Sequence, residues 1–126
     1  QQVIAVLDWE LSTLGHPFAD LAYQCMGMRL PAAEEPGTSS GLMGVDVAAL
    51  GIPSEQEYVA KYCERMGLDK IDNWSFYLAF SFFRLAAICQ GVAKRAADGN
   101  ASNKRANSVG AMVQPLAMNA INIINE

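Results

Sequence analysis

The segment from Asn73 to about Ala97 is the feature that most constrains how this chain can fold. Asn73, or Asp72 before it, is of a type that caps helices, and Gly99 follows as a typical helix stop. The first half of the segment is apolar on nearly every side and carries the aromatic residues Trp74, Tyr77, Phe80, Phe82 and Phe83. A helix without a polar face has to be surrounded by other elements. We therefore predict a mainly α fold with this helix at its centre.

A second helix is predicted from a local capping motif. Ser54 can accept a hydrogen bond from the backbone amide of Glu57, and the Glu57 side chain can reach back to Ser54. The helix that begins at this capping box should run to about Met66, with Gly67 as its left-handed stop.

Prolines mark two further helices. Pro17 suits the first turn of a helix over about residues 17–28, because the N–H that it lacks is not needed there. Pro115 lies inside a helical segment over about residues 102–125 and should kink or split it, since it removes a backbone hydrogen bond. Residues 31–44 are rich in Gly, Pro and Ser, and we expect a loop there.

The apolar run Val3–Leu7 is the clearest strand signal. Its β-branched residues are typical of a strand that is buried on both faces, whereas Val45–Val47 is a weaker candidate. One strand cannot form a sheet, so its partners must come from elsewhere in the chain or from outside it. We expect a short N-terminal strand or hairpin that is the remnant of a larger sheet. Its free edge would also allow two copies to pair as a homodimer.

Length and composition favour one partial domain. The chain has 126 residues, of which 52% are hydrophobic and 17% charged, an apolar composition that suggests a buried helical core or a piece of a larger protein. The net charge of -4 provides no basic surface for nucleic acid or for an anionic membrane. The longest apolar stretch, Phe76–Cys89, is interrupted by Ser81 and Arg84 and is too short to span a bilayer. We expect a soluble protein with no nucleic-acid or membrane partner.

The cysteines indicate a reducing compartment. Cys25, Cys63 and Cys89 are far apart and odd in number, which fits reduced, buried thiols better than a disulfide framework. No basic segment of the signal-peptide type precedes the first apolar run. These features predict a cytoplasmic protein.

Acidic residues are concentrated near the start of the chain. Asp8 and Glu10 follow the predicted strand directly, and Asp20 falls in the first turn of the next predicted helix. Magnesium binds one or two carboxylates and takes its other ligands from phosphate and water, so Asp8 and Glu10 could supply the protein's share. The alternative, which the residues leave open, is that Asp8 only caps a turn and Glu10 is solvated.

The same segment resembles a known family. The residues VLDWE (6–10), GHP (15–17) and DLA (20–22) are similar to a motif of the aminoglycoside phosphotransferase and choline kinase group. These proteins are small-molecule kinases with a protein-kinase-like fold. The later residues NWSFY (73–77) and FSFFRLAAI (80–88) are closest to kinase-like domains that occur alone in bacteria or fused to acyl-CoA dehydrogenases.

The resemblance implies a fold and a set of roles. The chain would be the helical C-terminal part of the large lobe, Asp8 would bind Mg²⁺ held with ATP, and Glu10 would support that metal. Asp20 would brace the catalytic loop. The catalytic base, its loop and the nucleotide-binding lobe have no counterpart in this sequence, whose only histidine is His16, in the turn before a predicted helix. No catalytic residue is therefore assigned here, and the chain alone should not turn over ATP.

Arg84 lies in the middle of the most apolar helix, where an unpaired guanidinium would be costly. We predict that it pairs with Asp20 or another acid of the opening segment. The alternative is that Arg84 binds an anionic group of the substrate.

The phosphoryl acceptor is predicted only as a class. Few acids accompany the helix that carries Trp74, Tyr77, Phe80 and Phe83, which argues against a polycationic aminoglycoside and for a neutral or anionic hydroxylated small molecule. These aromatic residues could line the acceptor pocket, although at helical spacing ordinary core is the stronger interpretation.

Two interpretations of the whole chain remain. We divide residues 1–126, one partial domain, into a metal-bearing part (1–28), a loop (29–53) and a substrate-shaping helical part (54–126). In the first interpretation this is a fragment of an ATP-dependent small-molecule kinase. In the second it is a non-catalytic helical interaction or oligomerisation module, a pseudokinase remnant.

Overall fold

Helices make up the regular structure of the protein. The computed structural model describes residues 2–32, 41–100 and 106–126, and within these ranges extended pairing is limited to a single bridge between Pro31 and Met43. The α-helices and short 3-10 helices (η) are, in chain order, η1 (Trp9–Leu11), α1 (Pro17–Met26), η2 (Gly27–Arg29), α2 (Glu55–Met66), α3 (Trp74–Ala97), α4 (Ala106–Gly110) and α5 (Val113–Ile124). The prediction of a mainly α fold is confirmed.

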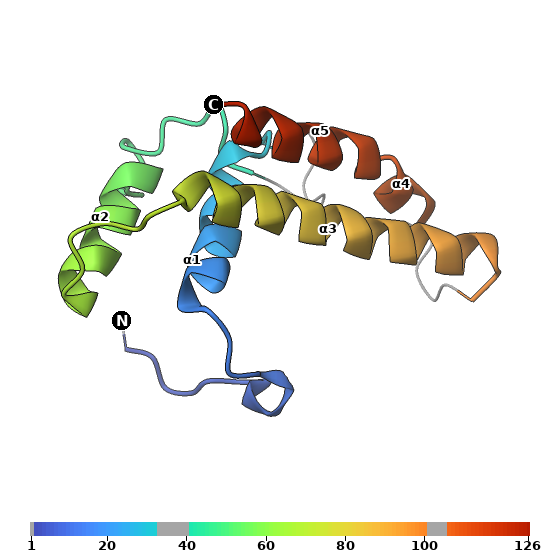
Figure 1. Ribbon diagram of the computed structural model, residues 1–126. Coiled ribbons are helices and arrows are strands. Elements are labelled where there is room, and N and C mark those ends of the chain that lie inside the picture. The colour runs from blue at the N-terminus through green and yellow to red at the C-terminus, as the bar shows by residue number, and fades with distance from the viewer. Residues whose placement is uncertain (1, 33–40, 101–105) are drawn as a thin grey trace.

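Helix α3 lies at the centre, as its apolar sequence predicts. It packs against α1 on one side and against α4 and α5 on another (Figure 1). The main core cluster joins these helices through fully buried side chains, among them Cys25 of α1, Leu78 and Phe82 of α3, and Leu116 of α5. Burial of each large apolar side chain stabilises the fold by about 1.5–3 kcal/mol.

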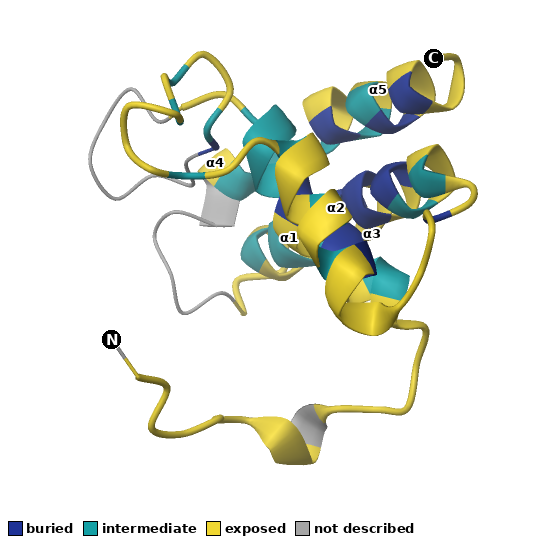
Figure 2. Cartoon of the chain, turned by 90° about the vertical axis from the view of Figure 1, so that its left-hand side faces the viewer, coloured by how far each residue is buried: buried dark blue, intermediate teal, exposed yellow. Residues whose placement is uncertain are grey.

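The outer side of α3 is open to solvent, which its uniformly apolar sequence does not predict. Phe76 and Phe83 are each 63% exposed, whereas Phe82 is fully buried. Figure 2 shows the same pattern, with buried residues confined to the sides of the helices that face one another. By length and composition alone α3 could also cross a membrane, a property that core helices of soluble proteins share.

Pro115 splits the last helical segment, as predicted. Helix α4 ends at Gly110 and α5 begins at Val113, so Pro115 lies in the first turn of α5, where no N–H is needed. The ring would clash with the carbonyl four residues earlier, at Ala111, which explains the position of the break. Gly110 lets α4 approach α3 closely, because a Cβ there would lie 3.0 Å from the Cβ of Ala93.

The capping motif of α2 forms as predicted. The Ser54 amide donates to Glu57 Oε2 at 2.8 Å, and the Glu57 amide donates to Ser54 Oγ at 3.3 Å. Gly67 ends the helix in the left-handed conformation, with φ 66°. Asn73 behaves differently from the prediction: it precedes α3 with φ 56° but makes no side-chain capping hydrogen bond.

The predicted strands do not form. Residues 2–8 have no regular secondary structure, and every residue from 2 to 10 is exposed. Residues 45–47 form a bend and the start of a turn instead, with the amide of Val47 donating to the carbonyl of Val45. Of the predicted loop over 31–44, residues 33–40 lie outside the described residues, as do residues 102–105 of the predicted last helix.

All three cysteines are free and buried, which fits the prediction of small apolar core residues. Burial, together with the nearby carboxylate of Glu55, raises the pKa of the Cys25 thiol to about 11. A thiol with a raised pKa is a poor nucleophile near neutral pH.

Candidate functional site

Asp8 stands at a strained backbone position. It has φ 57° and ψ 20°, the left-handed conformation, and immediately precedes the 3-10 turn Trp9–Leu11. Ser12 closes this turn, because its amide and its hydroxyl both donate to the carbonyl of Trp9, at 3.1 and 2.6 Å. A non-glycine residue in this conformation costs on the order of 1 kcal/mol, and such positions cluster at functional sites.

Asp8 and Glu10 are the two predicted magnesium ligands, and both are exposed. Within the described part of the chain no group of three or more His, Cys, Asp or Glu side chains is placed to hold a metal ion. Two carboxylates nevertheless match the usual protein share of a magnesium site, in which phosphate oxygens and waters complete the shell. The donor set therefore fits a metal shared with a phosphate ligand.

His16 connects this acidic segment to the helical core. It is the N-cap of α1, where Nδ1 accepts from the amide of Phe18 at 3.4 Å. Its Nε2 lies 3.4 Å from the hydroxyl oxygen of Tyr77 on α3, and the two rings are 5.2 Å apart. His16 lies in the turn before α1, as predicted, but its contact with α3 was not predicted. Its partner is far away in the sequence, so no local pattern could have revealed it.

The predicted ion pair of Arg84 with Asp20, or with another acid of the opening segment, is wrong for the described residues. The Arg84 guanidinium lies over the ring of Tyr23, 4.4 Å from its centroid, and Arg84 is exposed. Asp20 is also exposed and makes no ion pair within the described residues. A long arginine on an apolar helix can pack its stem on the protein and keep its charge in solvent, so the apolar neighbours in sequence did not require a buried partner.

The four aromatic residues of the predicted acceptor pocket separate into two pairs. Trp74 and Tyr77 are half-buried and pack against the core, which agrees with the alternative interpretation as core residues. Phe80 and Phe83 are 42% and 63% exposed. None of the four lines either of the two cavities described below.

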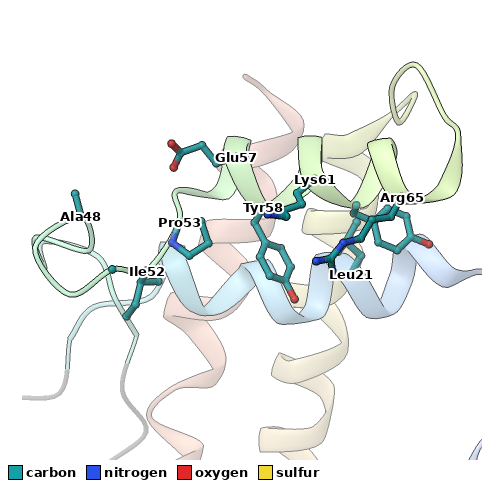
Figure 3. A pocket seen from close by; sticks show the side chains of 10 residues that line it. Leu21, Ala48, Ile52, Pro53, Glu57, Tyr58, Lys61 and Arg65 are labelled. Carbon is teal, nitrogen blue, oxygen red and sulfur yellow. The ribbon is translucent and has the colours of Figure 1, made fainter. Parts of the chain in front are cut away.

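The larger cavity, which we call the α1–α2 pocket, has a volume of about 580 Å³. It is lined by Leu21 of α1, by the turn that contains Ile52 and Pro53, and by side chains of α2 (Figure 3). No local sequence pattern predicts this pocket, because its walls come from three separate segments. A smaller cavity of about 300 Å³ lies beside Met28, Val45 and Glu55.

A partly buried polar cluster fixes the start of α2 to its neighbours. Arg29 donates to both carboxylate oxygens of Glu55, at 2.7 and 2.9 Å, and Trp74 Nε1 donates to the same carboxylate at 3.0 Å. Arg29 also pairs with Glu126 at 3.2 Å. We call Arg29, Glu55 and Trp74 the Arg29 cluster.

Interactions within the Arg29 cluster shift the pKa values of both Arg29 and Glu55. Burial raises the pKa of the Glu55 carboxyl, but the hydrogen bonds from Arg29 and Trp74 and the charge of Arg29 outweigh it, so the pKa lies below its ordinary value. The hydrogen bond to Glu55 raises the pKa of Arg29. The two charges therefore persist together over the neutral range.

A solved structure has a similar arrangement of these helices. It is the crystal structure of a Ralstonia eutropha JMP134 protein that is provisionally assigned as an aminoglycoside phosphotransferase. The TM-score is 0.85 and the identity 47%, over 97% of this chain and 36% of that one.

Sequence relatives agree with this assignment. The chain is similar to mouse acyl-CoA dehydrogenase family member 10, with 52% identity over 92% of this chain and 11% of that protein. Human acyl-CoA dehydrogenase family member 11 is 43% identical over 92% of this chain and 14% of its own length. No family model matches the chain. The chain thus spans only a small part of these relatives. The predicted resemblance to the aminoglycoside phosphotransferase group and to a segment of acyl-CoA dehydrogenase family members is confirmed.

Proposed function

We propose that this chain is the metal-bearing and acceptor-shaping part of an ATP-dependent small-molecule kinase. The activity would transfer a phosphoryl group from ATP to a hydroxyl of a neutral or anionic small molecule. The observation that carries the proposal is the left-handed Asp8, which is exposed at the start of a tight turn. The chain around it is 47% identical to a protein provisionally assigned as an aminoglycoside phosphotransferase.

The residues have distinct roles in this proposal. Asp8 would hold Mg²⁺ jointly with the terminal phosphates, with Glu10 in support. The metal would neutralise charge on the phosphoryl group during transfer. Asp20 has no ion-pair partner among the described residues, so its carboxylate is free to brace a catalytic loop. His16 would keep the segment in register with α3 through Tyr77.

The test uses a protein that carries this segment together with a catalytic loop and a nucleotide-binding lobe. Asp8→Asn keeps the size of the side chain and removes its charge. We expect Mg²⁺-dependent formation of ADP from ATP to fall by roughly a hundredfold, because the charge that holds the metal is lost. Binding of Mn²⁺ with ATP, followed by electron paramagnetic resonance, should weaken in the same variant.

The matched control is Glu64→Gln, which removes an exposed carboxylate from α2 and should leave both measurements unchanged. Unchanged turnover in Asp8→Asn would reject the role of Asp8.

The second candidate, a non-catalytic interaction module, is favoured by one observation. The apolar residues Val3, Ile4 and Leu7 are 83%, 95% and 81% exposed, and exposed apolar surface of this kind promotes association. Sedimentation of the 126-residue chain tests this candidate. A monomer at all concentrations would count against self-association through this segment.

A further inference from the structure

The α1–α2 pocket has the dimensions of a small-molecule site. Its volume of about 580 Å³ falls within the range of about 300–1,000 Å³ that ligand pockets occupy. Leu21, which is only 8% exposed, together with Ile52 and Pro53 gives it an apolar wall. The opposite wall is formed by α2, and all the charged side chains that line the pocket come from this helix.

Two cations on that wall, Lys61 and Arg65, outnumber its single acid, Glu57. Lys61 and Arg65 are one helical turn apart on α2, so they share a face. Across the described chain, neither makes an ion pair or a hydrogen bond. The pocket also includes one acid, Glu57, but its carboxylate is hydrogen-bonded to the amide and hydroxyl of Ser54. In Figure 3 this carboxylate points away from Tyr58 and Arg65.

Two tyrosines add polar groups at the same place. Tyr58 and Tyr62 are also one turn apart on α2, and Figure 3 shows the Tyr58 ring extending from α2 across α1. Neither hydroxyl makes a hydrogen bond to another of the described residues. A tyrosine combines an apolar ring with a hydroxyl that donates or accepts, which suits a ligand with both apolar and polar parts.

From this combination we propose that the α1–α2 pocket binds a small amphiphilic anion, a phosphate or carboxylate attached to an apolar body. Arg65 and Lys61 bind the anionic group, with the arginine fork suited to two oxygens at once. Leu21, Ile52 and Pro53 contact the apolar body.

The pocket shares no lining residue with the proposed magnesium site. No residue of the segment 2–17, which carries Asp8 and Glu10, lines the pocket. The proposal therefore stands whether or not the protein is a kinase, and it can be tested on the 126-residue chain without ATP or a metal.

The test compares three probes of similar shape: 2-naphthyl phosphate, 2-naphthoate and neutral 2-naphthol. Each is titrated into the chain labelled with ¹⁵N, and the amide shifts of Leu21, Ile52 and Lys61 report on the pocket. We expect the two anions to move these signals and to bind more tightly than 2-naphthol. Stronger binding of the phosphate identifies a phosphate site, and equal binding of both anions identifies a general anion site.

Two double variants distinguish binding in the pocket from nonspecific electrostatic attraction of the anions to the protein. Lys61→Gln with Arg65→Gln should weaken binding of the anions about tenfold, the effect of losing hydrogen bonds from charged groups. Lys94→Gln with Arg95→Gln removes the same charge from the end of α3 and should leave binding unchanged. Circular dichroism confirms that each variant retains its helices.

A pocket-filling variant keeps the test independent of charge. Ala48 is exposed in a turn that lines the pocket, so Ala48→Phe should occupy the cavity without disturbing the core. It should weaken binding of all three probes. The proposal would be overturned if both double variants lost anion binding equally. It would also be overturned if the probes left the amide signals of Leu21, Ile52 and Lys61 unchanged.

Discussion

The helical core and the N-terminal segment differ in what holds them in place. Ala22, Cys25 and Phe82 of the core have no exposed surface, whereas Ile4 and Leu7 of the segment are 95% and 81% exposed. Burial of apolar surface is the dominant stabilising term in folding. The core is therefore fixed by its own packing.

The segment is held by the turn at Trp9–Leu11 and by the contact of His16 with Tyr77 of α3. The proposed chemistry lies in the second region, so the proposed metal ligands Asp8 and Glu10 lie outside the packed core.

The largest expected effect is on the core. Phe82→Ala should lower the free energy of unfolding by about 3–5 kcal/mol, because it removes a large, fully buried side chain and leaves a cavity. The matched change Phe83→Ala, at a position that is 63% exposed on the same helix, should cost less than about 1 kcal/mol. Urea unfolding monitored by circular dichroism measures both. Similar losses at the two positions would contradict the placement of α3.

The second largest effect on stability is expected in the Arg29 cluster. Glu55→Gln removes one charge of a partly buried pair and should cost about 1–2 kcal/mol. Glu64→Gln, an exposed change on the same helix, should have an effect within about 0.5 kcal/mol. A negligible cost in Glu55→Gln would mean that the cluster does not hold α2 in place.

The same variant gives a pH dependence with a defined sign. The pKa of Glu55 lies below its ordinary value of 4.5, so the folded state favours the charged carboxylate. Its contribution to stability is complete above pH 4.5 and is lost as the pH falls through the lowered pKa. The difference in unfolding free energy between the natural chain and Glu55→Gln should therefore shrink below pH 4.5. A difference that stays constant down to acid pH would contradict the lowered pKa.

Local signals predicted the fold better than the site. The capping box at Ser54, the stop at Gly67 and the break near Pro115 each depend on residues within one or two turns, so the sequence contains the whole interaction. The Arg29 cluster joins residues 26 and 19 positions apart, and no periodicity reveals such a pair. The apolar residues around Arg84 in the sequence did not predict its exposure. Exposure depends on which side of α3 the other helices cover.

A smaller effect is expected at the helix cap. Ser54→Ala removes the hydroxyl that accepts from the Glu57 amide and should cost about 1 kcal/mol. Ser75→Ala changes an exposed serine in the first turn of α3 and serves as the control. Thermal unfolding distinguishes the two. An equal shift of both would show that the capping box adds nothing beyond helix propensity.

The smallest effect separates the two regions most sharply. Ile4→Ser replaces an apolar side chain that is 95% exposed, so the unfolding free energy of the 126-residue chain should change by less than about 0.5 kcal/mol. A loss above about 1 kcal/mol would mean that residues 2–8 are packed within the chain. If the segment forms a sheet with residues outside this chain, the same change in a protein containing the whole kinase-like fold should cost more. The difference between the two measurements then gives the share of the stability of the Asp8 segment that comes from outside these 126 residues.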